Sequence, residues 1–317
     1  MNPPRIPAPS REALLAALLV VEGAVFSVTG HGFASMDNVL GLTRLACEAG
    51  LLALALAPVV LAGGIDLSIG SLLGLSSVVL GLLWRDAGWP WPWAAAGAVA
   101  CGALGGLVNA VAVARLRANP LIVTLGTLSL FRGLAEALTR GVDTVTGFPA
   151  AFLSLGQGAL AGGVPVQAPL LAAALAGSWL LVHRHRCGRE WRAIGFSAEG
   201  ALHAGVPVGR RRLQAHLLAG VAAGVAAVVQ VSRVGQAKAD AGTGMELLAV
   251  TAVVLGGTHL SGGRGSIAGT FLGFAVLAVL RNGLQLSDQP AELAGILTGV
   301  VLLGVLVLGA RRGGRGG

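Results

Sequence analysis

The stretch from Leu61 to Ser71 reads LAGGIDLSIGS and lies inside an apolar run that extends from Leu45 to Leu83. It places one carboxylate, Asp66, where a charged side chain in a bilayer costs roughly 2.5 to 3.5 kcal/mol on the gentlest scale. Gly63 and Gly64 precede it, and residues without a Cβ let the backbone leave helical geometry. Irregular backbone inside a membrane persists only where protein buries it or water lines it. We therefore expect this stretch to separate two helices, with Asp66 beside a partner, in a water-filled space or near the interface.

The same pattern returns much later in the chain. Residues 63–68 read GGIDLS and residues 256–261 read GGTHLS, so both copies follow the pattern GGxxLS. We call them the GGIDLS break and the GGTHLS break. Each follows an apolar run and leads through Gly-Ser into another apolar run. Interrupted helices at matching positions of an internal repeat are typical of transporters and indicate a translocation pathway. The alternative is a chance likeness of glycine-rich helix ends in a chain with 50 glycines.

The composition is that of an integral membrane protein. Hydrophobic residues make up 55% of the chain and charged residues 11%, whereas charged residues make up about a quarter of soluble domains. Because a spanning helix needs about 20 apolar residues, we predict an all-α, polytopic fold with about ten transmembrane helices in one domain, residues 1–317. The net charge of +8 comes mostly from arginine, which orients a membrane protein and meets anionic lipid. No nucleic-acid partner is implied.

Ten apolar runs set the expected topology. They cover residues 12–30, 44–62, 66–84, 91–113, 119–139, 168–184, 213–232, 246–262, 266–286 and 291–310. The loop of residues 183–212 carries seven arginines, so the positive-inside rule places it in the cytoplasm. Counting outward from this loop places both termini in the cytoplasm and both breaks toward the same side. This favours a parallel over an inverted repeat, with halves at about residues 44–140 and 213–310.

The arginine-rich loop contains a second recognisable segment. Glu199-Gly200-Ala201 is followed after three residues by Gly205. Ser197 is a suitable N-cap, Glu199 favours the first turn, and Gly205 with Pro207 ends a helix. The pattern predicts a short helix in the cytoplasm. The simpler alternative is a basic loop that contacts anionic lipid.

Three ordered motifs resemble a known family. They are GGIDLSIGS at residues 63–71, NPLIVTLGTLSLFRG at 119–133 and AGTGMELLAVTAVVLGGTHLSGGRGS at 241–266. Together they resemble the ribose-type sugar permeases of bacterial ATP-binding-cassette importers, in a superfamily that also holds branched-chain amino acid permeases. The resemblance covers about residues 45–308.

The resemblance implies a multi-pass permease subunit in the inner membrane. Such a subunit pairs with a second permease copy or paralogue and forms the pathway for a monosaccharide. A soluble binding protein delivers the solute, and a cytoplasmic ATPase drives its import. The segment with Glu199, Gly200, Ala201 and Gly205 resembles the ATPase-docking loop of these permeases, except that Gly200 stands where the family pattern has alanine.

The residues expected along the pathway are the glycines of both breaks and the polar residues of the apolar runs. They are Gly63, Gly64, Asp66, Ser68, Asn109, Gly256 and Gly257. Asn109 interrupts the apolar run of residues 91–113, where it either forms a hydrogen bond between helices or lines the pathway. The substrate is less defined, because His259 stands where the family pattern has a small hydroxyl.

The sequence also excludes some chemistry. It contains no G-x-x-x-x-G-K-[ST] motif and no arrangement of nucleophile, base and acid, so we expect no catalytic residue and no cofactor in this chain. ATP would be bound and hydrolysed by a partner subunit. His183, His185 and Cys187 alternate with arginines, whose charge opposes a metal ion.

Two other functions stay open at this stage. Related permeases carry branched-chain amino acids or nucleosides. A stand-alone secondary transporter would need an ion-coupling acid, for which Asp66, Glu48 and Glu246 are available.

Overall fold

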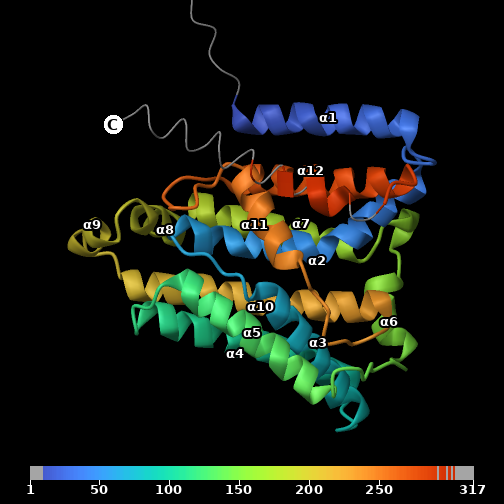
Figure 1. Ribbon diagram of the computed structural model, residues 1–317, viewed down its shortest axis with the longest axis horizontal. Coiled ribbons are helices and arrows are strands. Elements are labelled where there is room, and N and C mark those ends of the chain that lie inside the picture. Colours follow the sequence, from blue (N-terminus) through green and yellow to red (C-terminus); the bar gives the residue numbers. More distant parts are fainter. Residues whose placement is uncertain (1–9, 291–292, 298, 301–302, 304–317) are drawn as a thin grey trace, which may run out of the picture.

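The computed structural model describes residues 10–290, 293–297, 299–300 and 303. Long helices lie side by side along the long axis of the molecule (Figure 1). Between the described helices, isolated β-bridges join Val145 to Ala237 and Ala159 to Pro165. The all-α, polytopic prediction is confirmed.

The helices follow one another along the chain with short connections. They are α1 (Arg11–Thr29), α2 (Met36–Leu61), α3 (Ile69–Arg85), α4 (Trp91–Ala114), α5 (Pro120–Leu138), α6 (Ala150–Gln157), η1 (Ala161–Gly163), α7 (Gln167–Trp179), η2 (Leu180–Arg184), α8 (Arg186–Phe196), α9 (Ala198–His203), α10 (Val208–Val234), α11 (Met245–Leu255) and α12 (Ile267–Leu286). Six of them, α1, α2, α4, α5, α10 and α12, are long and apolar enough to span a membrane. The predicted helix of residues 291–310 lies mostly outside the described residues, and the number of crossings stays a prediction.

Two predicted helices differ from the structure at the breaks. The helix predicted over residues 246–262 ends at Leu255, because Gly256 and Gly257 follow and the chain turns into a loop. The helix predicted over residues 66–84 begins only at Ile69, because residues 65–68 are non-helical. Both differences leave the helix shorter than the 20 residues or so that span a bilayer.

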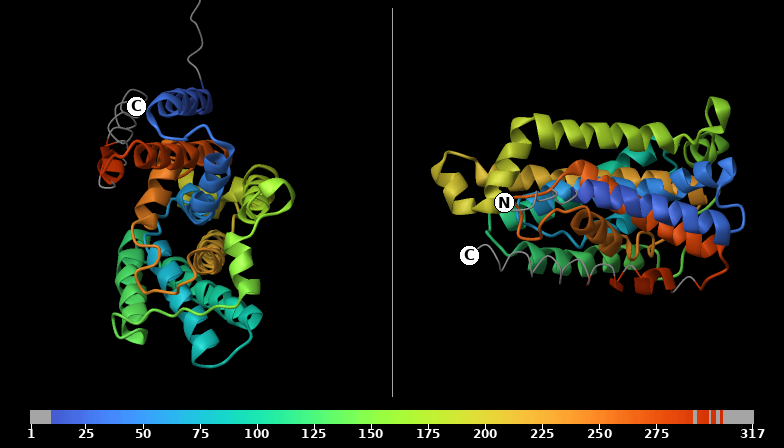
Figure 2. Two further views of the ribbon diagram at one scale, coloured as in Figure 1. Left: turned by 90° about the vertical axis from the view of Figure 1, so that its right-hand side faces the viewer. Right: turned by 90° about the horizontal axis from the view of Figure 1, so that it is seen from above.

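The centre of the molecule is α2. Its side chains are buried from Cys47 to Leu54 and again from Leu56 to Leu61, under α7, α10, α11 and α12. Figure 2 shows these helices around it in the view along the long axis. By contrast α1 packs mainly on α12 and leaves Val20 and Val28 72% and 88% exposed. These two valines are on a surface suited to lipid.

Glycines bring helix backbones into direct contact. A Cβ on Gly102 or Gly106 of α4 would overlap the backbone of Gly220 in α10. Small residues four positions apart let helix backbones approach closely in a membrane, where lipid offers no hydrophobic drive to association. In the same way Gly256 and Gly269 join α11 to α12, and Figure 1 shows α11 running across the long axes of α2 and α12.

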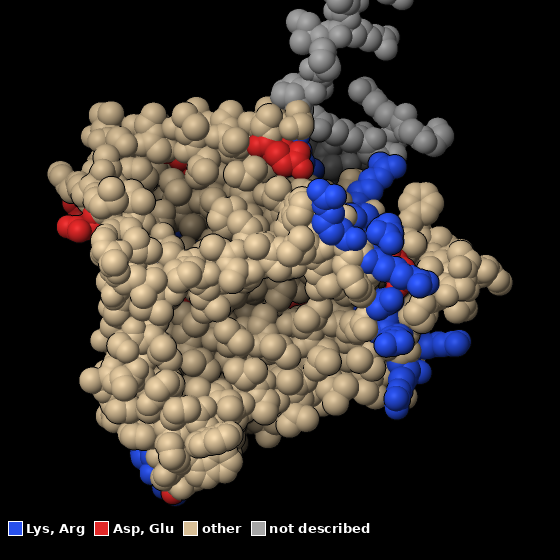
Figure 3. All heavy atoms as spheres, turned by 180° about the vertical axis from the view of Figure 1, so that it is seen from behind, with Lys and Arg blue, Asp and Glu red and all other residues tan. Residues whose placement is uncertain are grey.

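One end of the molecule carries most of the described arginines, and we call it the arginine-rich end (Figure 3). Its members are Arg115, Arg117, Arg184, Arg186, Arg189, Arg192, Arg210, Arg211, Arg212 and Arg264. Both GGxxLS breaks reach this end, where the Gly263 amide donates to the Leu61 carbonyl over 3.0 Å. The two breaks therefore lie on the same side of the molecule, as predicted. Because α2 has 26 residues and α11 has 11, the parallel repeat itself stays a prediction.

Candidate functional site

The GGIDLS break turns the chain back into the interior after α2. Gly63 has a φ of +76°, a left-handed conformation that glycine adopts without steric cost. The amides of Gly63 and Gly64 donate to the carbonyls of Val60 and Val59 over 2.9 and 3.0 Å, which closes the end of α2. The following residues are non-helical, and the Thr124 hydroxyl of α5 donates to the Ile65 carbonyl over 3.1 Å. The break is thus an ordered return toward α3.

We call the non-helical residues 64–68 between α2 and α3 the return segment. Asp66 is its polar centre and is only 3% exposed. Its Oδ1 accepts hydrogen bonds from the Ser68 amide over 2.9 Å and from the Ser68 hydroxyl over 2.7 Å. Its Oδ2 accepts from Asn109 Nδ2 over 3.3 Å and lies 3.2 Å from His216 Nδ1. A proton on Nδ1 makes this last contact a hydrogen bond, because an ionised carboxylate only accepts.

The partners of Asp66 are bonded to one another as well. Asn109 Nδ2 donates to the Ser68 hydroxyl over 2.7 Å, and the Thr127 hydroxyl donates to Asn109 Oδ1 over 2.7 Å. We call Asp66, Ser68, Asn109, Thr127 and His216 the Asp66 network. It joins the return segment to α4, α5 and α10. Of the two roles considered for Asn109, hydrogen bonding between helices is the one the structure shows.

Sequence reasoning missed two members of this network. His216 stands at the start of the apolar part of α10, and Thr127 is three residues after Thr124 on α5. Their signal was weak, because a single histidine or threonine in an apolar run is common and its partner lies more than 15 residues away in the sequence. Only the fold brings them to Asp66.

The Asp66 network is closed to solvent in this structure. Ser68 and Asn109 have no exposed surface. The adjacent cavity, which Gly64, Pro120 and His216 help to line, holds about 10 Å³, the volume of about one water probe. Such a cavity is too small for a monosaccharide, so the expected pathway role of Gly63, Gly64, Asp66, Ser68, Asn109, Gly256 and Gly257 stays a prediction.

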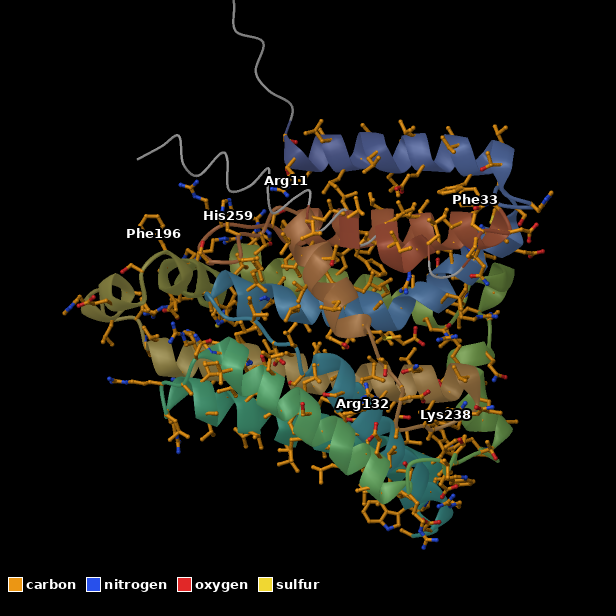
Figure 4. The ribbon with its side chains drawn as sticks, viewed as in Figure 1. Arg11, Phe33, Arg132, Phe196, Lys238 and His259 are labelled. Atoms are coloured by element: carbon orange, nitrogen blue, oxygen red, sulfur yellow. The ribbon has the colours of Figure 1, made fainter. Side chains whose placement is uncertain are left out.

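The GGTHLS break has a different conformation. Gly256 keeps a right-handed φ of −64°, and the left-handed residue is Gly257 at +96°. The guanidinium of Arg11 in α1 donates to the carbonyls of Leu255 and Val254 over 3.1 Å each, which satisfies the end of α11. His259 is exposed, and Figure 4 shows it near Arg11 at the arginine-rich end. This break is a loop that reaches the surface at His259 and Ser261, while Gly256 and Thr258 are buried.

Four glycines hold the two breaks against α8. A Cβ on Gly195 of α8 would overlap the Leu61 carbonyl and the Gly263 amide, and a Cβ on Gly262 would lie 2.7 Å from the Gly63 nitrogen. We call Gly63, Gly195, Gly262 and Gly263 the glycine junction. Here three backbone segments touch with no side chain between them.

Beyond this junction α8 and α9 form a hairpin that projects from the molecule (Figure 1). The Ser197 hydroxyl accepts from the Gly200 amide over 3.0 Å, and Gly205, at a φ of +78°, ends the helix. The predicted short helix with an N-cap at Ser197 is confirmed. Glu199 and Gly200 are exposed and Ala201 is buried, while Phe196 and Leu202 are apolar residues left 80% and 59% exposed (Figure 4).

Buried contacts fix the base of this hairpin on α10. Trp191 Nε1 donates to the Arg211 carbonyl over 2.9 Å, and Glu190 accepts from both Arg211 and Arg186. Burial raises the pKa of Glu190, but the hydrogen bonds from Arg211 and Arg186 outweigh it and hold that pKa below its usual value. The hairpin is therefore anchored to the first turn of α10.

The remaining candidates have structural partners. Glu48 has no exposed surface and accepts from Arg233 Nε over 2.7 Å, and Glu246 Oε1 accepts from the Gly244 amide over 3.2 Å. His183 Nε2 accepts from the Ile267 amide over 3.2 Å. Among the described residues no group of three or more His, Cys, Asp and Glu could hold a metal ion.

The chain is similar to known permease proteins over most of its length. An autoinducer 2 import system permease protein LsrD from Yersinia pseudotuberculosis is 38% identical over 266 residues, which cover 82% of this chain and 79% of that protein. A protein of the same name from Escherichia coli is 39% identical over 264 residues, with the same coverage of 82% and 79%. No solved structure gives a significant match. Residues 38–306 match the family described as branched-chain amino acid transport system / permease component, and the chain belongs to this family.

Proposed function

We propose that this multi-pass inner-membrane protein is the permease subunit of an ATP-driven importer for a monosaccharide or a solute of similar size and polarity. A separate ATPase and a soluble binding protein are its partners, and a second permease copy or paralogue completes the pathway. The observation that carries the proposal is the exposed hairpin of α8 and α9 in a chain of a permease family. Because the sequence has no P-loop motif, the ATPase must be another polypeptide.

The hairpin has the properties of a docking element. Interfaces depend on a few apolar anchors at their centre, surrounded by polar residues that guide encounter. Phe196 and Leu202 supply exposed apolar surface close to Glu199 in the sequence. Arg210, at the start of α10, is an exposed charge that follows Leu202 by eight residues. The arginine-rich end then faces the cytoplasm, in accord with the positive-inside rule.

The glycine junction supports a role in energy coupling. Because Gly195 touches the backbone of both breaks, a displacement of α8 reaches them without passing through a flexible side chain. From α10 the Asp66 network continues this connection to α3, α4 and α5. Movement of the docking hairpin would thus change the packing around both breaks.

The relatives of this chain indicate the class of solute, and the closed interior indicates which subunit selects it. Two relatives are named for autoinducer 2 import, and the sequence motifs resemble ribose-type permeases. The family description names branched-chain amino acids, which are therefore the second candidate. A closed Asp66 network cannot select a solute in this state, so the binding protein would set specificity.

Docking is tested by a charge placed on the exposed tip. We expect Leu202→Glu to abolish co-purification of the ATPase without loss of folding, since Leu202 is 59% exposed. Val142→Glu is the matched control, because Val142 is 88% exposed and lies outside the arginine-rich end. If the Leu202 variant binds the ATPase as well as the Val142 variant does, the hairpin is not the docking element.

The solute is tested by uptake into proteoliposomes that contain the permease, its ATPase and its binding protein. Labelled ribose, autoinducer 2 and leucine are compared at equal concentration, with and without ATP. We expect ATP-dependent uptake of ribose or autoinducer 2. Uptake of leucine alone would favour the amino-acid alternative, and uptake that requires an ion gradient and no ATP would contradict the importer.

A further inference from the structure

An open apolar groove lies between α7 and α12. Ala172 and Ala176 of α7 and Ala268 of α12 are exposed small residues along its walls, and the groove encloses about 610 Å³. It continues into a second cavity of about 280 Å³ that reaches Ala168. From Trp179 to Ala168 the groove runs for about 16 Å at 1.5 Å per residue, which matches one leaflet of a hydrocarbon core about 30 Å thick. We call it the α7–α12 groove.

The lining of the groove suits a hydrocarbon chain. Phe271 and Leu272 of α12 and Leu175 of α7 contribute its apolar surface, and its small residues leave space that no side chain of the described residues fills. An apolar chain laid into such a groove gains contact on several sides, which a flat helix surface does not offer. The shape therefore favours one acyl chain in an extended form.

The mouth of the groove is positively charged. At the arginine-rich end the Arg184 guanidinium lies 5.3 Å from the centre of the Trp179 ring, and Trp179 lines the groove. The His183 ring stacks on Trp179 with 5.9 Å between centroids and accepts from the Ile267 amide at the start of α12, so it bridges α7 and α12. Among the described residues Arg184 forms no ion pair with a carboxylate.

We propose that the α7–α12 groove binds one anionic phospholipid, with an acyl chain in the groove and the headgroup phosphate at Arg184. The depth of one leaflet fits a lipid better than a crossing helix, and the basic mouth selects anionic over zwitterionic headgroups. The interfacial tryptophan fixes the boundary between chain and headgroup. This site does not depend on the proposed function, because it is defined by lipid binding alone.

The test measures retained lipid. The full chain is purified from detergent with equal amounts of phosphatidylglycerol and phosphatidylethanolamine, and bound lipid is counted by native mass spectrometry. We expect one retained lipid, with phosphatidylglycerol preferred by about fivefold for one arginine contact. Arg184→Gln should remove the preference and keep a lipid, whereas Arg189→Gln, another exposed arginine at the same end, should keep the preference.

Filling the groove should remove the lipid itself. Ala176→Phe places a ring in the groove from an exposed position, and Ala268→Leu does so from the opposite wall. Leu104→Phe, at a residue 62% exposed on α4, is the control. Equal retention of both lipids by the wild type, or full retention by both filled variants, would overturn the proposal. So would a disulfide-linked dimer of Ala176→Cys in a background without native cysteines, because a second copy would then occupy the groove.

Discussion

The two GGxxLS breaks share a pattern and differ in almost everything that surrounds it. Asp66 of the GGIDLS break is 3% exposed and bonded to residues of α4 and α10, whereas His259 at the same position of the GGTHLS break is exposed. The left-handed glycine also differs, since it is the first glycine of one break, Gly63, and the second of the other, Gly257. An identical spacing thus encodes a buried return segment in one place and a loop that reaches the surface in the other.

The difference teaches that the variable positions of the pattern decide its environment. An aspartate can enter the interior only with donors around it, and Ser68, Asn109 of α4 and His216 of α10 supply them. An exposed histidine needs no such partners. The glycines allow the chain to turn, and the residues after them determine whether it turns inward or outward.

The largest expected loss of stability follows from removal of the Asp66 carboxylate. Asp66→Leu leaves His216, Asn109 and Ser68 without their shared acceptor, and a buried donor left unsatisfied costs about 1 to 3 kcal/mol. We expect a large loss of thermal stability in detergent, followed by loss of transport. Asp66→Asn should be milder, because an amide oxygen still accepts from Ser68. A Leu variant as stable as the wild type would show that the network does not hold the fold.

A smaller effect is expected from packing at the second break. A Cβ on Gly256 would overlap the backbone of Gly269 and Thr270, so Gly256→Ala must push α11 away from α12. Overpacking of this kind costs about 1 to 3 kcal/mol. The measurement is the unfolding midpoint in detergent, with Gly126→Ala as a control, since nothing lies within 4 Å of a Cβ at Gly126. An unchanged midpoint would mean that the helix crossing is loose.

At the GGIDLS break, substitutions of Gly63 should change the stability through the backbone conformation. Gly63 has a φ of +76°, so Gly63→Ala should destabilise by about 1 to 2 kcal/mol. Gly63→Asn should recover part of the loss, because asparagine tolerates left-handed geometry. At Gly256, whose φ is −64°, asparagine should be no better than alanine. If asparagine fails to help at Gly63, the two glycines do not differ in the way described.

The attachment of the α8–α9 hairpin to α10 through Glu190 should depend on pH. Because the pKa of Glu190 is lowered in the fold, its contribution is complete above its ordinary pKa of about 4.5 and is lost as the pH falls through the lower folded value. Glu190→Gln removes this contribution. We therefore expect the difference in hydrogen-exchange protection of α8 between wild type and variant to be largest at neutral pH and to shrink below about pH 4.5. A difference that stays constant to pH 3 would contradict the role of the ionised group.

The smallest effect is expected at the exposed counterpart of Asp66. His259→Leu should change the stability by less than about 0.5 kcal/mol, as is usual for exposed residues without special contacts. Made beside Asp66→Leu and measured by the same thermal scan, it compares equivalent positions of the two breaks directly. A loss comparable with that of Asp66→Leu would show that the loop has a tertiary role that its exposure hides.

The sequence predicted the helical membrane fold and the short helix after Ser197, because apolar runs and capping residues are local signals. It also identified Asp66 as a residue in need of partners. It could not name His216, since a contact across 150 residues has no local signature. The end of α11 at Leu255 was missed because the predicted helix was extended through Gly256 and Gly257 to residue 262, although this glycine pair ends the helix.

The distance in sequence between Asp66 and His216 has a consequence for the synthesis of the chain. At about 5 to 20 residues per second, the 150 residues between them take about 8 to 30 s to be made. During that interval Asp66 has Ser68 and then Asn109 as donors but lacks His216, and a charged side chain at bilayer depth costs roughly 2.5 to 3.5 kcal/mol. We therefore expect the full set of hydrogen bonds to Asp66, and with it the final depth of the return segment, to form only after α10 has been made.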